Sequence, residues 1–90
     1  MSARKLLVVV DDSPEFRAAL RYAQRLLERA PCREDAHRVI MRCYVRLGER
    51  AQAFAQYRLC AHVLQTEYGA TPEPATTALF ELVRLDPGLV

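Results

Sequence analysis

The apolar residues of this chain repeat at an offset of 34 positions, and this repeat restricts the possible folds more than any other feature. Ala53 lies 34 positions after Ala19. At the same offset, further apolar residues correspond in the pairs Leu20 and Phe54, Ala23 and Tyr57, and Leu27 and Ala61. A period of this length accommodates two helices with their turns, which is the unit of helical repeat proteins. The sequence therefore predicts antiparallel helical hairpins that pack on one another.

Four segments have the spacing of amphipathic helices, with apolar residues at steps of three and four. The first begins at Pro14, which suits the first helical position, and Ser13 is predicted to cap it. The others begin near residues 34, 50 and 75. The segments end at residues that interrupt helices, namely Pro31, Gly48, Gly69 and the run 86–88. The expected apolar faces of the second and fourth helices are Ala36, Val39, Ile40, Cys43, Tyr44 and Leu47, and Ala75, Ala78, Leu79, Leu82 and Val83.

The middle of the chain carries a recognisable order of apolar and small residues. Its members are Ile40, Tyr44, Gly48, Ala53 and Tyr57, preceded by Pro31. In this order and spacing the chain resembles the tetratricopeptide motif. His37 stands where that motif usually has tryptophan, and Met41 replaces its first glycine, so looser packing is expected at the start of the second helix. The alternative is a bundle of four unrelated amphipathic helices.

A longer pattern runs from Ala19 to Leu85. In chain order it includes residues 33–38, 41–42, 47–50, Ala53, 56–57, Cys60 and 78–80. The segment 67–74 is similar to an acidic–Leu–Gly–x–x–Pro–x–Pro signature, with Tyr68 in place of leucine. In these residues the chain resembles the bacterial transcriptional activator domain, a helical domain that follows a winged-helix DNA-binding domain in antibiotic-regulatory-type activators.

This resemblance implies a regulatory domain over residues 14–90, preceded by an apolar arm over residues 1–13. No winged-helix domain precedes the matching stretch in this sequence, and the family's leading helices are missing or replaced. The resemblance therefore implies a place in transcription regulation without direct reading of DNA. A truncated remnant of a larger activator is an alternative interpretation.

The arm itself suggests a second alternative. Leu6–Val10 is an apolar run, and Asp11, Asp12 and Ser13 follow it directly. This arrangement is similar to the first strand and acidic pair of response-regulator receivers, in which paired carboxylates hold magnesium. Here no later strand rich in valine or isoleucine ends in aspartate, so an apolar arm that leads into a capped helix is the expectation.

Composition and cysteine usage exclude several classes of protein. The chain is 51% hydrophobic and 27% charged, which is typical of a soluble globular domain. No apolar run is long enough to span a membrane, and no signal peptide is expected, so we predict a cytoplasmic protein. The three cysteines, Cys32, Cys43 and Cys60, form no CxxC pair, so reduced and mostly buried thiols are expected, with no metal and no cofactor. A net charge of +2 is too small to indicate nucleic-acid binding by itself.

The candidate site is a row of arginines on the second helix. Arg38, Arg42 and Arg46 recur every four residues and should form one ridge, which the family resemblance would place in a groove that binds carboxylates of a partner. A solvated basic face is an equal alternative. No nucleophile–base pair is apparent, because His37 and His62 are far apart, so catalysis is not expected.

The predicted function is therefore protein–protein interaction, by self-association or by docking onto a partner. Arg17, Arg21 and Arg25 make a similar ridge on the first helix. Weak nucleic-acid binding through that ridge is the most distant alternative.

Overall fold

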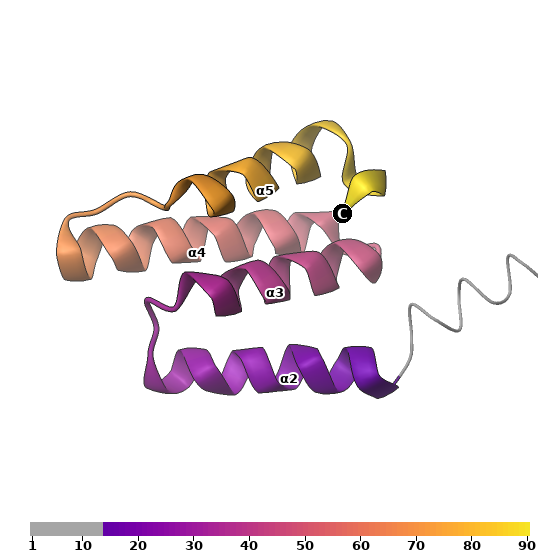
Figure 1. The fold of residues 1–90 in the computed structure, drawn as a ribbon, viewed down its shortest axis with the longest axis horizontal. Coiled ribbons are helices and arrows are strands. Elements are labelled where there is room, and N and C mark those ends of the chain that lie inside the picture. Colours follow the sequence, from indigo (N-terminus) through magenta and orange to yellow (C-terminus); the bar gives the residue numbers. More distant parts are fainter. Residues whose placement is uncertain (1–13) are drawn as a thin grey trace, which may run out of the picture.

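The computed structural model describes residues 14–90, which form four α-helices and one turn of 3-10 helix (Figure 1). The elements are α2 (Pro14–Arg29), α3 (Glu34–Arg46), α4 (Arg50–Tyr68), α5 (Pro74–Leu85) and η1 (Pro87–Leu89). This all-helical architecture of hairpins confirms the predicted fold class, and the helices begin and end where the sequence signals indicate. The predicted arm over residues 1–13, its acidic pair and the Ser13 cap lie outside the described residues.

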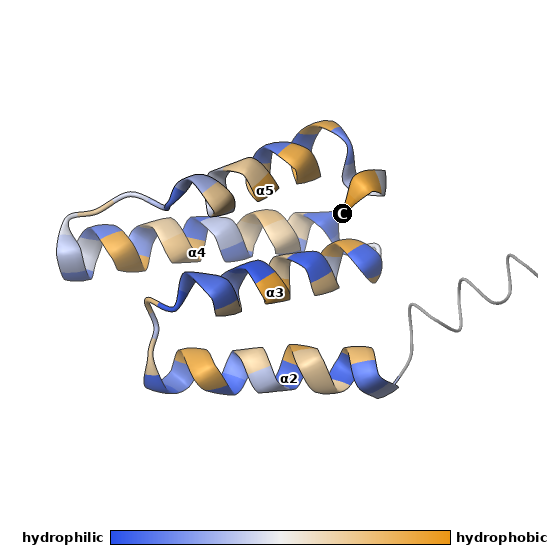
Figure 2. Ribbon diagram, viewed as in Figure 1, coloured by the Kyte–Doolittle hydropathy of each residue, from blue (hydrophilic) through white to orange (hydrophobic). Residues whose placement is uncertain are grey.

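Helix α3 lies at the centre of the domain (Figure 1). It packs against α2 on one side and α4 on another, while α5 contacts both α3 and α4. Hydrophilic and hydrophobic stretches alternate along each helix, as expected for helices that bury one stripe (Figure 2). Within the described range, no helix is both long enough and apolar enough to cross a membrane.

The turn between α3 and α4 depends on Gly48. Its φ of 78° lies in the left-handed region, which glycine adopts without steric cost. In this conformation the Gly48 N–H donates to the carbonyl of Val45 at 3.0 Å, and the Glu49 N–H donates to the carbonyl of Tyr44 at 2.7 Å. These two bonds satisfy carbonyls that the end of α3 would otherwise leave without partners. Gly69 ends α4 in the same left-handed region.

Two hydrophobic clusters hold the helices together. The first joins α3, α4 and α5 through Met41, Ala53, Leu79 and Val83. The second joins α2 to α3 through Ala23, Ala36 and Ile40, with half-buried leucines around them. Small alanines at the centre of both clusters let neighbouring helices approach closely.

Aromatic rings fill the space between α4 and α5. Tyr57 stacks on Phe80 with ring centroids 4.2 Å apart, and Phe54 meets the same ring edge-on at 5.7 Å. Both are favourable geometries for aromatic pairs. Tyr57 and Phe54 are the large residues that the 34-residue repeat places on the buried side of the third helix.

The structure corrects the sequence prediction at two places in the core. His37 and Met41, the departures from the tetratricopeptide motif, are fully buried. They therefore pack the start of α3 tightly, and the expectation of looser packing is wrong. On α5, Ala75 and Ala78 are exposed, and Thr76 takes the buried position instead, so the buried face is rotated by about one residue from the predicted one.

We expect Gly48→Ala to lower the free energy of unfolding by about 1 kcal/mol, because a Cβ makes the left-handed conformation unfavourable. The space around Gly48 is open, so the cost is conformational and not steric. For a domain of this size the melting temperature should fall by roughly 4–8 °C. Gly88→Ala is the matched control, because Gly88 has no positive φ and its Cβ would meet only Asp86 at an ordinary 3.6 Å. Thermal melts that show equal shifts for the two variants would contradict this account of the turn.

Candidate functional site

The arginine ridge predicted on α3 is divided by the fold. Arg38 is only 18% exposed at its side chain, and its Nη1 donates to the hydroxyl of Thr76 at 2.8 Å. The same nitrogen pairs with the carboxylate of Glu73 at 2.5 Å. Arg38 therefore holds the start of α5 against α3, so its role is a structural one within the domain.

A carboxylate from α3 completes this network. Oε1 of Glu34 accepts a hydrogen bond from the Thr76 hydroxyl at 2.7 Å and another from the Glu73 backbone N–H at 3.0 Å. Glu73 precedes α5 but makes no side-chain cap of its own. A negative charge beside the first turn of a helix is favourable, so Glu34 stabilises the start of α5 from a neighbouring helix.

The other two arginines of the ridge remain exposed. Nη2 of Arg46 donates to the backbone oxygen of Val90 at 3.1 Å. Arg42 makes no ion pair or hydrogen bond within the described part of the chain. Of the three predicted residues, Arg42 is therefore the one whose side chain has no partner among the described residues, and partner binding by the three together stays a prediction.

Arg50, which sequence reasoning did not select, has a role at the opposite end of α5. Its Nε donates to the carbonyl of Val83 at 3.1 Å, and its Nη2 donates to the carbonyl of Arg84. Its guanidinium also lies 5.5 Å from the centre of the Phe54 ring. A cation at the end of a helix satisfies carbonyls without partners, so Arg50 caps α5 from α4.

His37 is a buried bridge and not an exposed residue. Its Nε2–H donates to the carbonyl of Pro31 at 2.8 Å, and its Nδ1 accepts from the side-chain amide of Gln56 at 2.8 Å. Both ring nitrogens are therefore used in packing the α2–α3 turn onto α4. Burial lowers the pKa of His37, because the charged imidazolium is poorly solvated there.

Two of the three cysteines are buried, in agreement with the predicted burial. Cys43 and Cys60 are buried, Cys32 is half-buried, and all three are free thiols. Burial raises the pKa of the Cys43 thiol, and it raises the pKa of Cys60 to about 11. A protonated thiol is a poor nucleophile and a poor metal ligand. Among residues 14–90 no three side chains of the metal-binding types gather.

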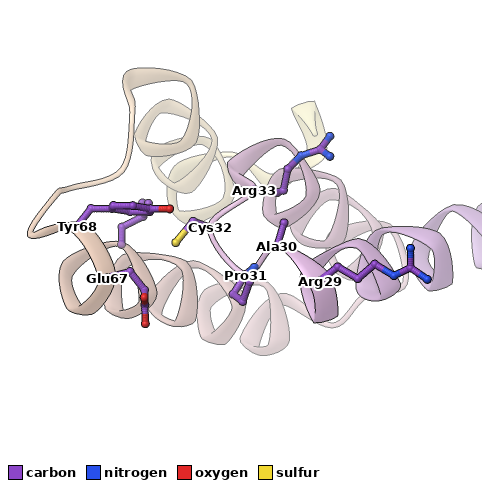
Figure 3. Close-up of a pocket in the computed structure, with 8 residues that line it drawn as sticks. Arg29, Ala30, Pro31, Cys32, Arg33, Glu67 and Tyr68 are labelled. Atoms are coloured by element: carbon purple, nitrogen blue, oxygen red, sulfur yellow. The ribbon is translucent and has the colours of Figure 1, made fainter.

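Two hollows lie on either side of Arg33. The first, called the turn pocket, has a volume of about 630 Å³ and is lined by the α2–α3 turn and the end of α4. Cys32 and Tyr68 face one another across it, while Arg29, Arg33 and Glu67 extend away from it (Figure 3).

The second hollow, called the α2–α3 groove, is smaller, with a volume of about 300 Å³. It is lined by Ala19, Tyr22, Ala23 and Leu26 of α2 and by Ala36 and Val39 of α3. Arg33 and Asp35 also line the groove, and they form an ion pair whose nearer nitrogen and oxygen are 2.6 Å apart. That pairing lowers the pKa of Asp35 to about 2, chiefly through the hydrogen bond from Arg33.

Antiparallel helical hairpins, buried polar bridges and exposed arginines define a small helical domain of the tetratricopeptide-like class. The family model for the bacterial transcriptional activator domain matches residues 11–84. The chain therefore belongs to the bacterial transcriptional activator domain family, as its sequence pattern indicated. The match begins at Asp11, so it includes the acidic pair on which the receiver alternative depended. No curated protein and no solved structure matches the chain.

Removal of the shared hydroxyl should loosen α5. We expect Thr76→Val to lower the free energy of unfolding by roughly 1–3 kcal/mol, since Arg38 and Glu34 both lose a buried partner. The neighbouring Thr77→Val is the control, because Thr77 is exposed and its hydroxyl donates only to the Glu73 carbonyl at 3.4 Å. That change should cost less than about 0.5 kcal/mol. Urea unfolding followed by circular dichroism measures both, and equal costs would refute the network.

The buried imidazole should make stability depend on pH. The unfolded chain binds a proton at His37 with a pKa near the ordinary value of about 6.5, while the folded chain binds it less readily. The unfolded state therefore gains protons first as the pH falls through and below about 6.5, and the free energy of unfolding decreases in that range. His37→Phe should flatten this dependence, whereas His62→Gln, at an exposed histidine, should retain it. Chemical unfolding at a series of pH values compares the slopes, and an unchanged slope in His37→Phe would disprove the assignment.

Proposed function

We propose that this chain is a non-catalytic regulatory domain that acts in transcription control by binding a protein, and that it does not read DNA itself. The observation that carries the proposal is membership of the bacterial transcriptional activator domain family, over residues 11–84. We further infer that it works in the cytoplasm, where transcription regulators of bacteria act.

The environments of the buried histidine and cysteine side chains support the part of this proposal that the domain is not catalytic. His37, the buried histidine, has both ring nitrogens occupied by packing contacts. Cys43 and Cys60 are buried thiols whose pKa values are raised. General acid–base or nucleophilic catalysis needs groups that can reach a substrate with a pKa close to the working pH. These residues instead have the environments of structural groups.

The distribution of arginines supports the binding part. Arg38 and Arg50 hold the two ends of α5 through hydrogen bonds within the domain. The side chain of Arg42, on the exposed side of α3, makes no such hydrogen bond among the described residues. Exposed guanidinium groups on a rigid helix are suited to carboxylates of a protein partner, because they form directional, charge-assisted hydrogen bonds.

A transcript measurement in the host tests the proposal. Cells that express the wild-type chain should differ in the levels of particular transcripts from cells that lack it. Arg42→Glu should weaken those differences by reversing the exposed charge, while Arg58→Glu, an exposed arginine on α4, should preserve them. Circular dichroism of each purified variant checks that the helices remain intact. If no transcript responds to the wild-type chain, the regulatory role is wrong.

A further inference from the structure

We propose that the α2–α3 groove binds an acidic amphipathic segment of a partner protein. The inference rests on the proposed function, because it names the surface and the kind of partner through which the domain would act. Apolar side chains of the segment enter the groove, and its carboxylates pair with arginines of α2 and α3.

The groove offers an apolar lining that the domain leaves partly uncovered. Ala19 is exposed, Val39 is half-buried, and Tyr22 at the edge is 64% exposed. Ala23 is the one residue of α2 that is fully buried. The small side chains of the lining leave room for larger aliphatic groups from outside, and burial of such groups is the usual driving force for helix-in-groove recognition.

Arginines flank this lining on both helices. Arg25 follows Tyr22 by three residues, and Arg29 follows Leu26 by three. Residues three apart are neighbours on a helix surface, so each of these arginines lies one turn from a residue that lines the groove. Arg29 also lines the adjoining turn pocket.

The α3 side of the groove also has an arginine three residues after a lining residue. Arg42 follows Val39 by three residues, again as a surface neighbour. Arg25, Arg29 and Arg42 are exposed and make no ion pair within residues 14–90. From Ala19 to Arg29 the helix rises about 15 Å, so a helical segment of roughly ten residues covers the groove.

Charge selects an acidic protein segment over other occupants. α2 carries four arginines and two glutamates, so a second copy placed against this face would bring like charges together. A nucleic acid supplies phosphates but no aliphatic side chains for the apolar part of the lining. An amphipathic segment with glutamates or aspartates satisfies the lining and the arginines together.

The binding test uses the full chain and a designed probe. The probe is a fluorescein-labelled helical peptide of about 14 residues with leucines at steps of three and four and glutamates elsewhere. A companion peptide carries lysine in place of glutamate, and a single-stranded oligonucleotide of similar length serves as the nucleic-acid arm. Fluorescence anisotropy measures the affinity of each.

Groove variants are compared with matched changes on α4. Ala19→Trp fills the groove from an exposed position, and Ala55→Trp places the same side chain on an exposed position of α4. The variant Arg25→Glu reverses one charge next to the groove, and Arg58→Glu, which makes the same change at an exposed arginine of α4, is its control. Thermal melts of all variants confirm that each remains folded.

The acidic peptide should bind, and both groove changes should weaken it by about tenfold or more, while the α4 changes alter it by less than about twofold. The lysine peptide should not bind. Absence of binding, equal effects of groove and α4 variants, or tighter binding of the oligonucleotide would overturn the inference. A transcript effect that persists when the peptide fails would leave the regulatory function standing and refute only this partner. Peptide binding without any transcript effect would support the groove and refute the regulatory role.

Discussion

The hydroxyl of Thr76 joins Arg38 to Glu34, and the position of α5 depends on this buried contact. A fully buried polar group is costly unless its hydrogen-bonding capacity is met, and here one hydroxyl both accepts and donates. Arg38 is paired with the carboxylate of Glu73, and Glu34 adds a second carboxylate beside the first turn of α5. The network therefore places net negative charge at the positive end of the α5 dipole. It specifies one arrangement of α5 on α3, while the aromatic contacts and the buried Leu79 and Val83 add apolar packing against the rest of the domain.

Much of this fold follows from local patterns. Helix ends could be predicted from Pro14, Gly48 and Gly69, because glycine and proline act on the backbone of their own turn. The repeat also placed Ala53 and Tyr57 correctly on the buried side of α4. Such features need no knowledge of distant residues, so sequence reasoning recovers them well.

The residues that sequence reasoning misread are polar ones whose partners lie far along the chain. Arg38 has the spacing of a solvent-exposed ridge, and only the return of the chain some 35 residues later makes it a partly buried contact between helices. Thr76 and His37 are polar and so were not placed in the core, yet each finds two hydrogen-bond partners there. Burial of a polar side chain depends on tertiary partners that local spacing does not reveal. For His37 the one useful signal was its position in the tetratricopeptide motif, because a large buried residue usually occupies that position.

The same reasoning separates the arginines into two groups with different consequences. Arg38 and Arg50 fix the two ends of α5 through side-chain hydrogen bonds. Arg25, Arg29 and Arg42 are exposed and make no ion pair within the described residues, and each lies three positions after a residue that lines the groove. In stacked helical domains an outermost helix needs a polar outer face to remain soluble, and the arginines of α2 provide one. Charged residues of either sign, at any position on that outer face, would be enough to keep the domain soluble. Arginines beside the groove on both α2 and α3 favour recognition of an acidic segment, because each guanidinium group attracts a carboxylate of a segment that occupies the groove.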